Sequence, residues 1–212
     1  MTLVLALHSS SDVLGVGVAP LAAAGSPCPE PGGMDLRCQA FPLGRALSNQ
    51  LFAAVETVLP ADQWTRIGRL AVALGPGGFT GTRLTVVMAR TLAQQLAVPL
   101  DGVGSFLLMA RRLQLREPTW LVQTLPRRGV VAGCYGPDPA AWSGIAELAA
   151  PKLYPDLAAL PAGPQCPAVV ELPADVEQLL ALAGLAAADP DRQRAPWQPV
   201  LPLYPTSPVA EG

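Results

Sequence analysis

Residues 74–84 read LGPGGFTGTRL, and this stretch decides how the rest of the chain is interpreted. The apolar residues 70–74 predict a short buried strand, and the pattern from about Thr82 to Ala97, closed by Pro99, predicts a helix. A glycine-rich turn that leads from a strand into a helix N-terminus can bind an anion such as phosphate. The same glycines suit a tight turn with positive φ and close packing, with Thr80 as the N-cap candidate, and we favour this structural role.

We call this turn the glycine loop. It does not match the dinucleotide-binding fingerprint, because Thr80 stands where the third glycine would be. The candidate residues of the glycine loop are Gly75, Gly77, Gly78, Thr80, Gly81 and Arg83.

The elements around the glycine loop predict an α/β protein that opens in the order β-β-β-α-β-α. Strands are expected at 3–7, 13–19 and 35–41, with a loop at 20–35, and a helix at 45–59. Downstream, the pattern predicts helices at 105–114 and 176–188, and strands at 119–124 and 129–135. Sixteen of the 24 prolines lie between Pro118 and Pro208, which disfavours long elements there. We therefore expect a first lobe at 1–101 and a loop-rich second lobe at 102–212.

Composition excludes several classes of protein. Half of the 212 residues are hydrophobic, yet no apolar run is long enough to span a bilayer, and the first run lacks a basic flank. These features predict a cytoplasmic protein that does not enter a membrane. The four cysteines, Cys28, Cys38, Cys134 and Cys166, form no C-x-x-C pair, so we expect reduced thiols and no zinc site.

Two residue types are nearly missing, and this limits the chemistry further. His8 is the only histidine, so paired-histidine metal sites and histidine-based triads cannot be assembled. Lys152 is the only lysine, which excludes a P-loop of the form G-x-x-x-x-G-K-[ST]. We accordingly predict no catalytic residue, no bound metal and no cofactor.

The net charge of −2 hides an uneven distribution. Residues 63–137 carry nine arginines against two acids, a net +7, whereas residues 138–191 carry eight acids against one lysine, a net −7. Two interpretations stay open: differently charged surfaces that keep the protein soluble, or a basic face aimed at an acidic partner or at RNA.

Both first-lobe helices have more apolar surface than one core requires. The arc of the helix at 45–59 is about 160° wide. On the helix at 82–97, Val86, Ala89 and Leu92 mark the core side, while the opposite side mixes apolar and polar groups, as interfaces do. We expect a partner to cover this surplus, although the second lobe is the alternative. The candidate interface residues are Leu47, Leu51, Ala54, Leu84, Val87, Met88, Thr91 and Gln95.

The glycine loop, the opening LALHSSS at 5–11 and PLDGVGS at 99–105 together resemble the TsaB family, also called YeaZ. Weaker similarities are RRGVV at 127–131 and PLY at 202–204. The resemblance implies the actin/Hsp70-like ATPase fold of the ribonuclease-H type, with two lobes that each hold a mixed sheet and helices. It also implies a non-catalytic subunit that supports the catalytic TsaD in making threonylcarbamoyladenosine on tRNA.

The same resemblance implies a set of partners. They are TsaD, joined through the first-lobe helices, a TsaE ATPase reached through the complex, a possible second copy of the chain, and tRNA only indirectly or weakly. The chain departs from the family at three places: His8 stands where an Asp is usual, Leu125-Pro126 replaces another Asp, and Leu47-Ser48 lacks a His. Each departure removes a group that nucleotide or metal chemistry would use.

Three other functions are alternatives to the scaffold. A TsaD-like transferase of the same superfamily needs two histidines on the first helix, and an independent nucleotide- or phosphate-binding protein would use the glycine loop. For a glycopeptidase-type activity, the sequence shows no constellation of a nucleophile with its base and none for a metal.

Overall fold

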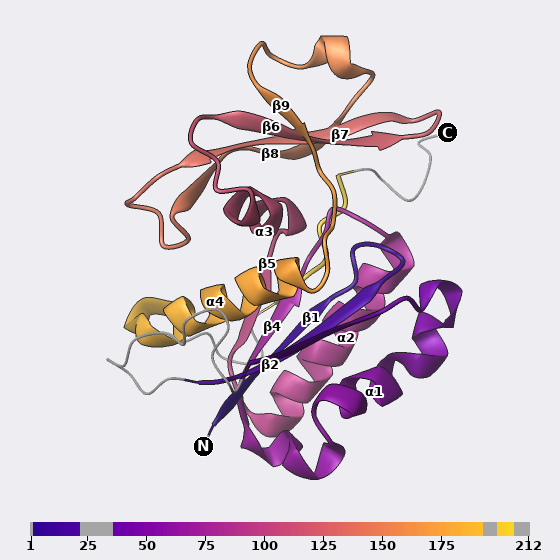
Figure 1. Cartoon of the computed structure of the whole chain (residues 1–212), viewed down its shortest axis with the longest axis vertical. Helices are drawn as coiled ribbons and strands as arrows, with labels where there is room; N and C mark the ends of the chain where they lie inside the picture. Colours follow the sequence, from indigo (N-terminus) through magenta and orange to yellow (C-terminus); the bar gives the residue numbers. More distant parts are fainter. Residues whose placement is uncertain (1, 22–35, 193–198, 206–212) are drawn as a thin grey trace.

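The computed structural model describes residues 2–21, 36–192 and 199–205, and it consists of two sheets stacked along the long axis of the molecule (Figure 1). The first sheet has the order β3-β2-β1-β4-β5, with β1 antiparallel to β2 and parallel to β4. Its strands are β1 (Leu3–His8), β2 (Leu14–Pro20), β3 (Arg37–Phe41), β4 (Ile67–Ala73) and β5 (Leu100–Val103).

The second sheet has the order β8-β7-β6-β9, and it is also mixed, since β6 pairs antiparallel with β7 and parallel with β9. Its strands are β6 (Thr119–Leu125), β7 (Gly129–Pro137), β8 (Ile145–Tyr154) and β9 (Gln165–Pro167). The α/β class with a mixed sheet and helices in each lobe is therefore confirmed.

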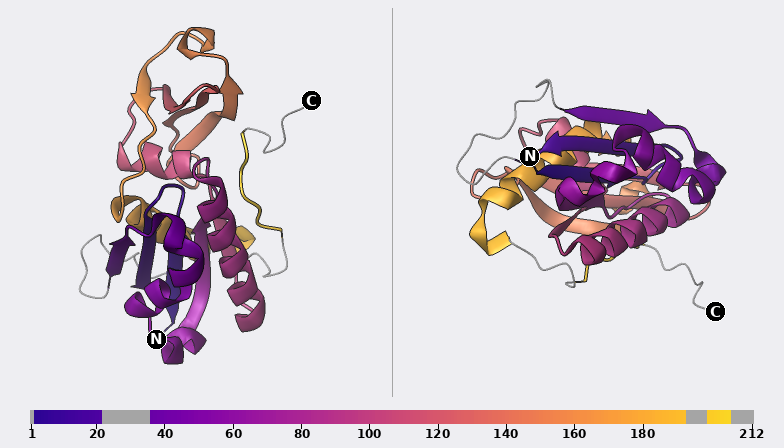
Figure 2. Two further views of the ribbon diagram at one scale, coloured as in Figure 1. Left: turned by 90° about the vertical axis from the view of Figure 1, so that its right-hand side faces the viewer. Right: turned by 90° about the horizontal axis from the view of Figure 1, so that it is seen from below.

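Helices cover both faces of the first sheet (Figure 2). α1 (Leu47–Val58) and α2 (Phe79–Leu96) pack on one face, and α4 (Ala174–Ala188) packs on the other. α3 (Ser105–Arg112) lies against β7 and β8 of the second sheet. In the described part of the chain, no helix is both long and apolar enough to cross a membrane.

β1 is buried on both faces, which explains its continuous apolar run. Leu3, Leu5 and Leu7 point into the core under α1 and α2, whereas Val4 and Ala6 point into the core under α4. The glycines of β2 face the core under α4, where a Cβ at Gly15 would lie 2.5 Å from Val176 Cγ2. The alternation of glycine with larger apolar residues therefore lets α4 approach the sheet.

α4 follows the second sheet in the sequence but packs on the first one. Residues that come after 101 thus complete the core of the first lobe. Arg69 of β4 forms a buried ion pair with Asp101 of β5, in which its Nε donates to Asp101 Oδ2 at 2.6 Å. The same guanidinium also holds the turn that follows α4, because its Nη2 donates to the Arg192 carbonyl oxygen at 2.9 Å. Arg69 is 1% exposed, so this pair is part of the core.

Several boundaries differ from the sequence prediction. α2 begins at Phe79 rather than near Thr82, and β5 was not expected. The second lobe, expected to be loop-rich over 102–212, contains a strand that the sequence did not predict: β8, a ten-residue edge strand. Its alanines and Pro151 have low strand propensity, but an edge strand tolerates a proline, and the pairing with β7 shifts register close by. The predicted loop at 20–35 and Cys28 lie largely outside the described residues.

Candidate functional site

The turn after β1 packs directly against the glycine loop. The Gly78 N–H donates to the Ser10 carbonyl oxygen at 2.8 Å. A Cβ at Gly77 would overlap this carbonyl group, and a Cβ at Gly81 would lie 2.8 Å from the Ser9 carbonyl oxygen. Glycine is needed at these two positions because the backbone of the turn approaches so closely.

Two hydroxyl pairs hold the same junction together. Ser9 Oγ lies 2.8 Å from Thr85 Oγ1 of α2, and Ser10 Oγ lies 2.6 Å from Ser105 Oγ at the start of α3. All four residues are buried. The hydroxyl groups of Ser9 and Ser10 therefore form their hydrogen bonds within the protein.

His8 ends β1 beside this junction and is 0% exposed. Its Nδ1 accepts a long hydrogen bond from the Ser10 N–H, and its Nε2 has no partner among the described residues. Burial penalises the charged imidazolium and lowers the pKa of His8 to about 4. His8 is therefore neutral at pH 7, as the sequence predicts, and supplies no negative charge for a metal-bound nucleotide.

The glycine loop contains one positive φ, at Gly75 (91°), which matches the expected tight turn. The N-cap prediction for Thr80 was wrong: α2 begins at Phe79, its N-cap is Gly78, two residues before Thr80, and no side chain caps the helix. Thr80 and Arg83 both lie on α2 and are exposed.

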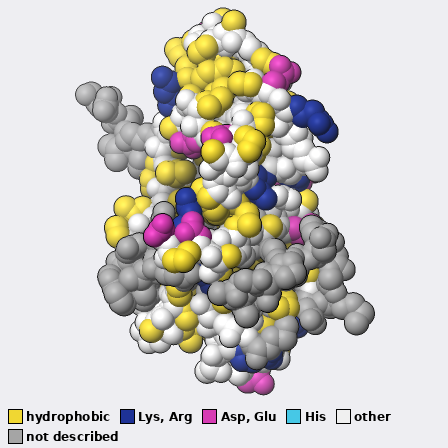
Figure 3. All heavy atoms as spheres, turned by 90° about the vertical axis from the view of Figure 1, so that its left-hand side faces the viewer, with side chains coloured by type: hydrophobic (Ala, Val, Ile, Leu, Met, Phe, Trp, Pro, Cys, Tyr) yellow, Lys and Arg dark blue, Asp and Glu magenta, His cyan; other side chains and the backbone are white. Residues whose placement is uncertain are grey.

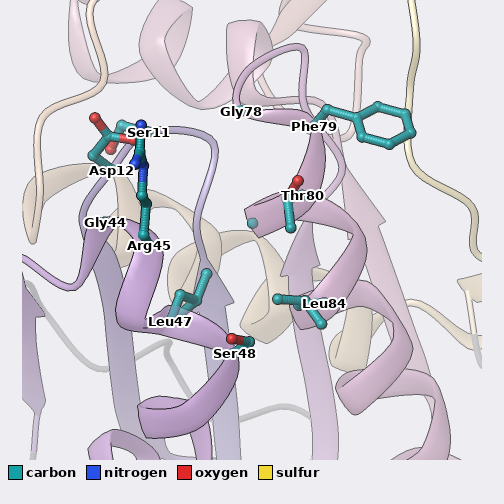
Figure 4. Close-up of a pocket in the computed structure, with 11 residues that line it drawn as sticks. Ser11, Asp12, Gly44, Arg45, Leu47, Ser48, Gly78, Phe79, Thr80 and Leu84 are labelled. Atoms are coloured by element: carbon teal, nitrogen blue, oxygen red, sulfur yellow. The ribbon is translucent and has the colours of Figure 1, made fainter. Parts of the chain in front are cut away.

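A cavity of about 380 Å³ opens between the β1–β2 turn and the first turns of α1 and α2 (Figure 4). Asp12 and Arg45 lie on one side of it, and Thr80 and Leu84 lie on the other. Of the predicted interface residues, Leu47 and Leu84 line this cavity.

The predicted interface divides into buried and exposed residues. Leu47, Leu51, Ala54 and Met88 are buried in the core formed with α1 and α2, so they cannot form an exposed docking face and that part of the prediction needs correction. The reason is that the two helices pack against each other as well as on the sheet. Val87, Thr91 and Gln95 are exposed and Leu84 is half-buried, so a surface stripe on α2 remains.

Phe52 on α1 is an exposed aromatic residue that was not among the predicted interface residues. Its side chain is 57% exposed, and its ring stacks on Trp64 with centroids 6.4 Å apart. The helical wheel counts Phe52 in the broad apolar arc with Leu51. A finer division of that arc would have separated the core side from this outer edge.

Comparison with solved structures identifies the architecture. YeaZ from Pseudomonas aeruginosa superposes with a TM-score of 0.69 at 21% identity, over 96% of this chain and all of that one. A second P. aeruginosa protein, described as uncharacterised with similarity to peptidase YeaZ, gives 0.71 at 20% identity, over 97% of this chain and all of that one. The chain has the YeaZ fold.

A sequence-family model supports the same relationship over part of the chain. The model of TsaD, tRNA N6-adenosine threonylcarbamoyltransferase, matches residues 43–126. The comparison with curated proteins gives no significant match. The resemblance to the TsaB (YeaZ) family that the sequence indicates is confirmed at the level of the two-lobe α/β fold.

Within this YeaZ fold, part of the uneven charge is paired internally. Arg112 of the basic segment donates to Asp175 Oδ1 at 2.7 Å and forms an ion pair with Glu171 at 2.9 Å, both from the acidic segment. On the face in Figure 3, basic and acidic side chains are interspersed, while hydrophobic side chains gather on the second lobe. This face carries no large field of one sign.

No three His, Cys, Asp or Glu side chains in residues 2–21, 36–192 and 199–205 are placed to hold a metal ion. Cys38, Cys134 and Cys166 are free thiols. Burial raises the pKa of Cys38 to about 11, with Glu177 adding to the effect, so this thiol is a poor nucleophile.

Proposed function

We propose that this chain is a TsaB-type scaffold subunit, which binds a TsaD-like catalytic subunit during synthesis of N6-threonylcarbamoyladenosine on tRNA. The observation that carries the proposal is the exposed apolar surface on α1 and α2, where Phe52 is 57% and Val87 52% exposed. Both helices lie within residues 43–126, the part that matches the TsaD model.

The chemistry of this surface suits a protein partner. Phe52 offers a large aromatic side chain, and aromatic residues in the centre of an interface contribute most of the binding energy. Val87 stands among the polar residues Thr91 and Gln95, as in the mixed composition of docking surfaces. A second copy of the chain could use the same surface when the partner is absent.

A supporting role agrees with the state of the polar groups near the glycine loop. His8, Ser9 and Ser105 are 0% exposed and Ser10 is 3% exposed, so a substrate cannot reach them in this conformation. Peptide hydrolysis through a covalent intermediate requires a nucleophile with a base within hydrogen-bond reach. His8 Nδ1 instead accepts from the backbone N–H of Ser10.

The remaining expectations belong to the same proposal. A TsaE-like ATPase joins through the complex rather than through this chain alone, and the protein works in the cytoplasm without a bound cofactor.

The test is co-purification of a tagged cognate TsaD with variants of the full chain. Val87→Glu places a carboxylate in the contact, and an unpaired buried charge costs several kcal/mol, so we expect binding to weaken by two or more decades. Val169→Glu is the matched control, because Val169 is 54% exposed and lies after β9 in the second lobe. Normal binding by Val87→Glu, or equal loss in the control, would show that the surface is wrongly assigned.

A further inference from the structure

The turn between β6 and β7 holds an arginine in a conformation that favours glycine. Arg127 has a φ of 63° and is followed two residues later by Gly129 with a φ of 101°. Among the described residues, the other non-glycine positive φ values belong to Ala97 and Gln114, which follow helices, where left-handed residues are common. In the turn, Gly or Asn would suit the backbone better, so Arg127 places its long cationic side chain there at a conformational cost.

A second strand brings another cation to this turn. The register pairs Val130 with Tyr154 and Ala132 with Lys152, so the end of β8 lies beside the base of the hairpin. Arg127, Arg128 and Lys152 are all exposed. Figure 1 shows the hairpin reaching the right-hand end of the upper sheet. We call these three residues the hairpin cations.

The hairpin cations differ from the arginines that hold the fold together. Arg69 and Arg112 are engaged with carboxylates and backbone carbonyls in the interior or between helices. In contrast, no ion pair found in the described part of the chain includes a hairpin cation. Lys152 Nζ lies 5.1 Å from the centre of the ring of Tyr154, which pairs with Val130 at the base of the hairpin. The nearby acid Asp156 accepts a hydrogen bond from the Ala159 N–H.

We propose that the hairpin cations bind the phosphate backbone of RNA. Exposed cations add little to the affinity of protein–protein contacts, because each such ion pair is screened by water and salt. On a nucleic acid the same groups release condensed counterions, and this makes exposed Lys and Arg effective. The inference rests on the proposed function, which supplies tRNA as the RNA at hand, and it locates a direct contact on this subunit.

The test measures binding of the full-length chain, without TsaD, to a fluorescein-labelled transcript of a tRNA that reads AAA codons. Fluorescence anisotropy between about 50 and 200 mM salt gives the dependence of log K on log[salt]. Three phosphate contacts predict a slope of about −2 to −3, and the double variant Arg127→Gly/Arg128→Gln should bring it to about −1. Glycine is chosen at 127 because it suits the positive φ, so the melting temperature should stay the same or rise.

Arg116→Gln is the matched control, since Arg116 is exposed and precedes β6, at the opposite end of that strand. It should leave the slope unchanged. Equal loss in Arg116→Gln would show diffuse attraction, and no measurable binding by the wild type would also overturn the proposal. Equal affinity for a DNA duplex with the same number of phosphates would reject RNA as the ligand. Co-purification of TsaD with the double variant separates this result from the scaffold proposal, because the hairpin belongs to the second sheet whereas α1 and α2 pack on the first.

Discussion

The hydroxyl oxygens of Ser10 and Ser105 lie 2.6 Å apart, and their hydrogen bond joins the turn after β1 to the first residue of α3. The backbone reinforces the connection, since the Ser105 N–H donates to the Gly75 carbonyl oxygen at 2.7 Å. One small region thus ties the first sheet, the glycine loop and the helix under the second sheet to one another. The hydroxyl and backbone groups of this region therefore hold the two lobes together.

Loss of one member of this hydroxyl pair should destabilise the fold. Ser105→Ala leaves the buried Ser10 hydroxyl without its partner, which costs about 1–3 kcal/mol. The free energy of unfolding in urea measures the effect. In a double-mutant cycle, Ser10→Ala/Ser105→Ala should lose less than the sum of the two single variants, and strict additivity would show that the hydroxyls do not interact.

His8 should make the free energy of unfolding depend on pH. Its pKa is about 4 in the folded protein and near 6.5 when unfolded, so the unfolded chain binds the extra proton between these values. The stabilisation is complete above pH 6.5 and falls as the pH decreases through about 4, by about 3 kcal/mol in total. The difference in unfolding free energy between wild type and His8→Gln isolates this contribution from the carboxylates. A pH-independent difference would contradict the buried neutral state.

The buried pair Arg69–Asp101 should be needed as a pair. Asp101→Ala leaves a guanidinium buried without its carboxylate, and such a change costs about 3–5 kcal/mol. Replacing both residues, as Arg69→Met/Asp101→Leu, should restore much of the stability because no buried charge remains. Urea unfolding compares the three proteins. If the double variant is less stable than Asp101→Ala, the attraction between the two charges outweighs the free-energy cost of burying them, and the prediction is wrong.

The isolated chain should not hydrolyse ATP. The Gly78 N–H at the start of α2 is bonded to the Ser10 carbonyl, and His8 at the end of β1 is buried and neutral, so it supplies no negative charge for a metal-bound nucleotide. A phosphate-release assay with Mg²⁺ and ATP should give only background turnover, and calorimetry reports binding separately. Turnover that disappears in His8→Ala would refute the non-catalytic assignment.

Val87 and Ala89 lie two residues apart on α2, and they should respond differently to the introduction of a charge. Val87→Glu should change the melting temperature little, because its side chain is 52% exposed, whereas Ala89→Glu should unfold the first lobe, because Ala89 is 0% exposed. Thermal unfolding by circular dichroism distinguishes the two. If both variants unfold, the stripe on α2 is core rather than docking surface.

Local patterns in the sequence predicted most of the first lobe, although not β5. The apolar run of β1, the strand before the glycine loop and the helices closed by Pro60 and Pro99 are set by residues close together in the chain. Periodicity and chain-breaking residues report local conformation, so they predicted these elements. They could not predict β8, because its strand state comes from pairing with β7, which overrides the low propensity of its alanines and Pro151.

The tertiary structure decided which surfaces are buried. A helical wheel places Leu51 and Phe52 in one apolar arc, yet Leu51 is 5% exposed and Phe52 57% exposed, because only one of them faces α2 and the sheet. Likewise, nothing near Val176 in the sequence indicates that α4 packs on the glycines of β2. The sequence alone determined the residue types, and hence that a single histidine and lysine exclude several active sites. Burial depends on contacts between distant segments, so only the folded chain separates core from docking surface.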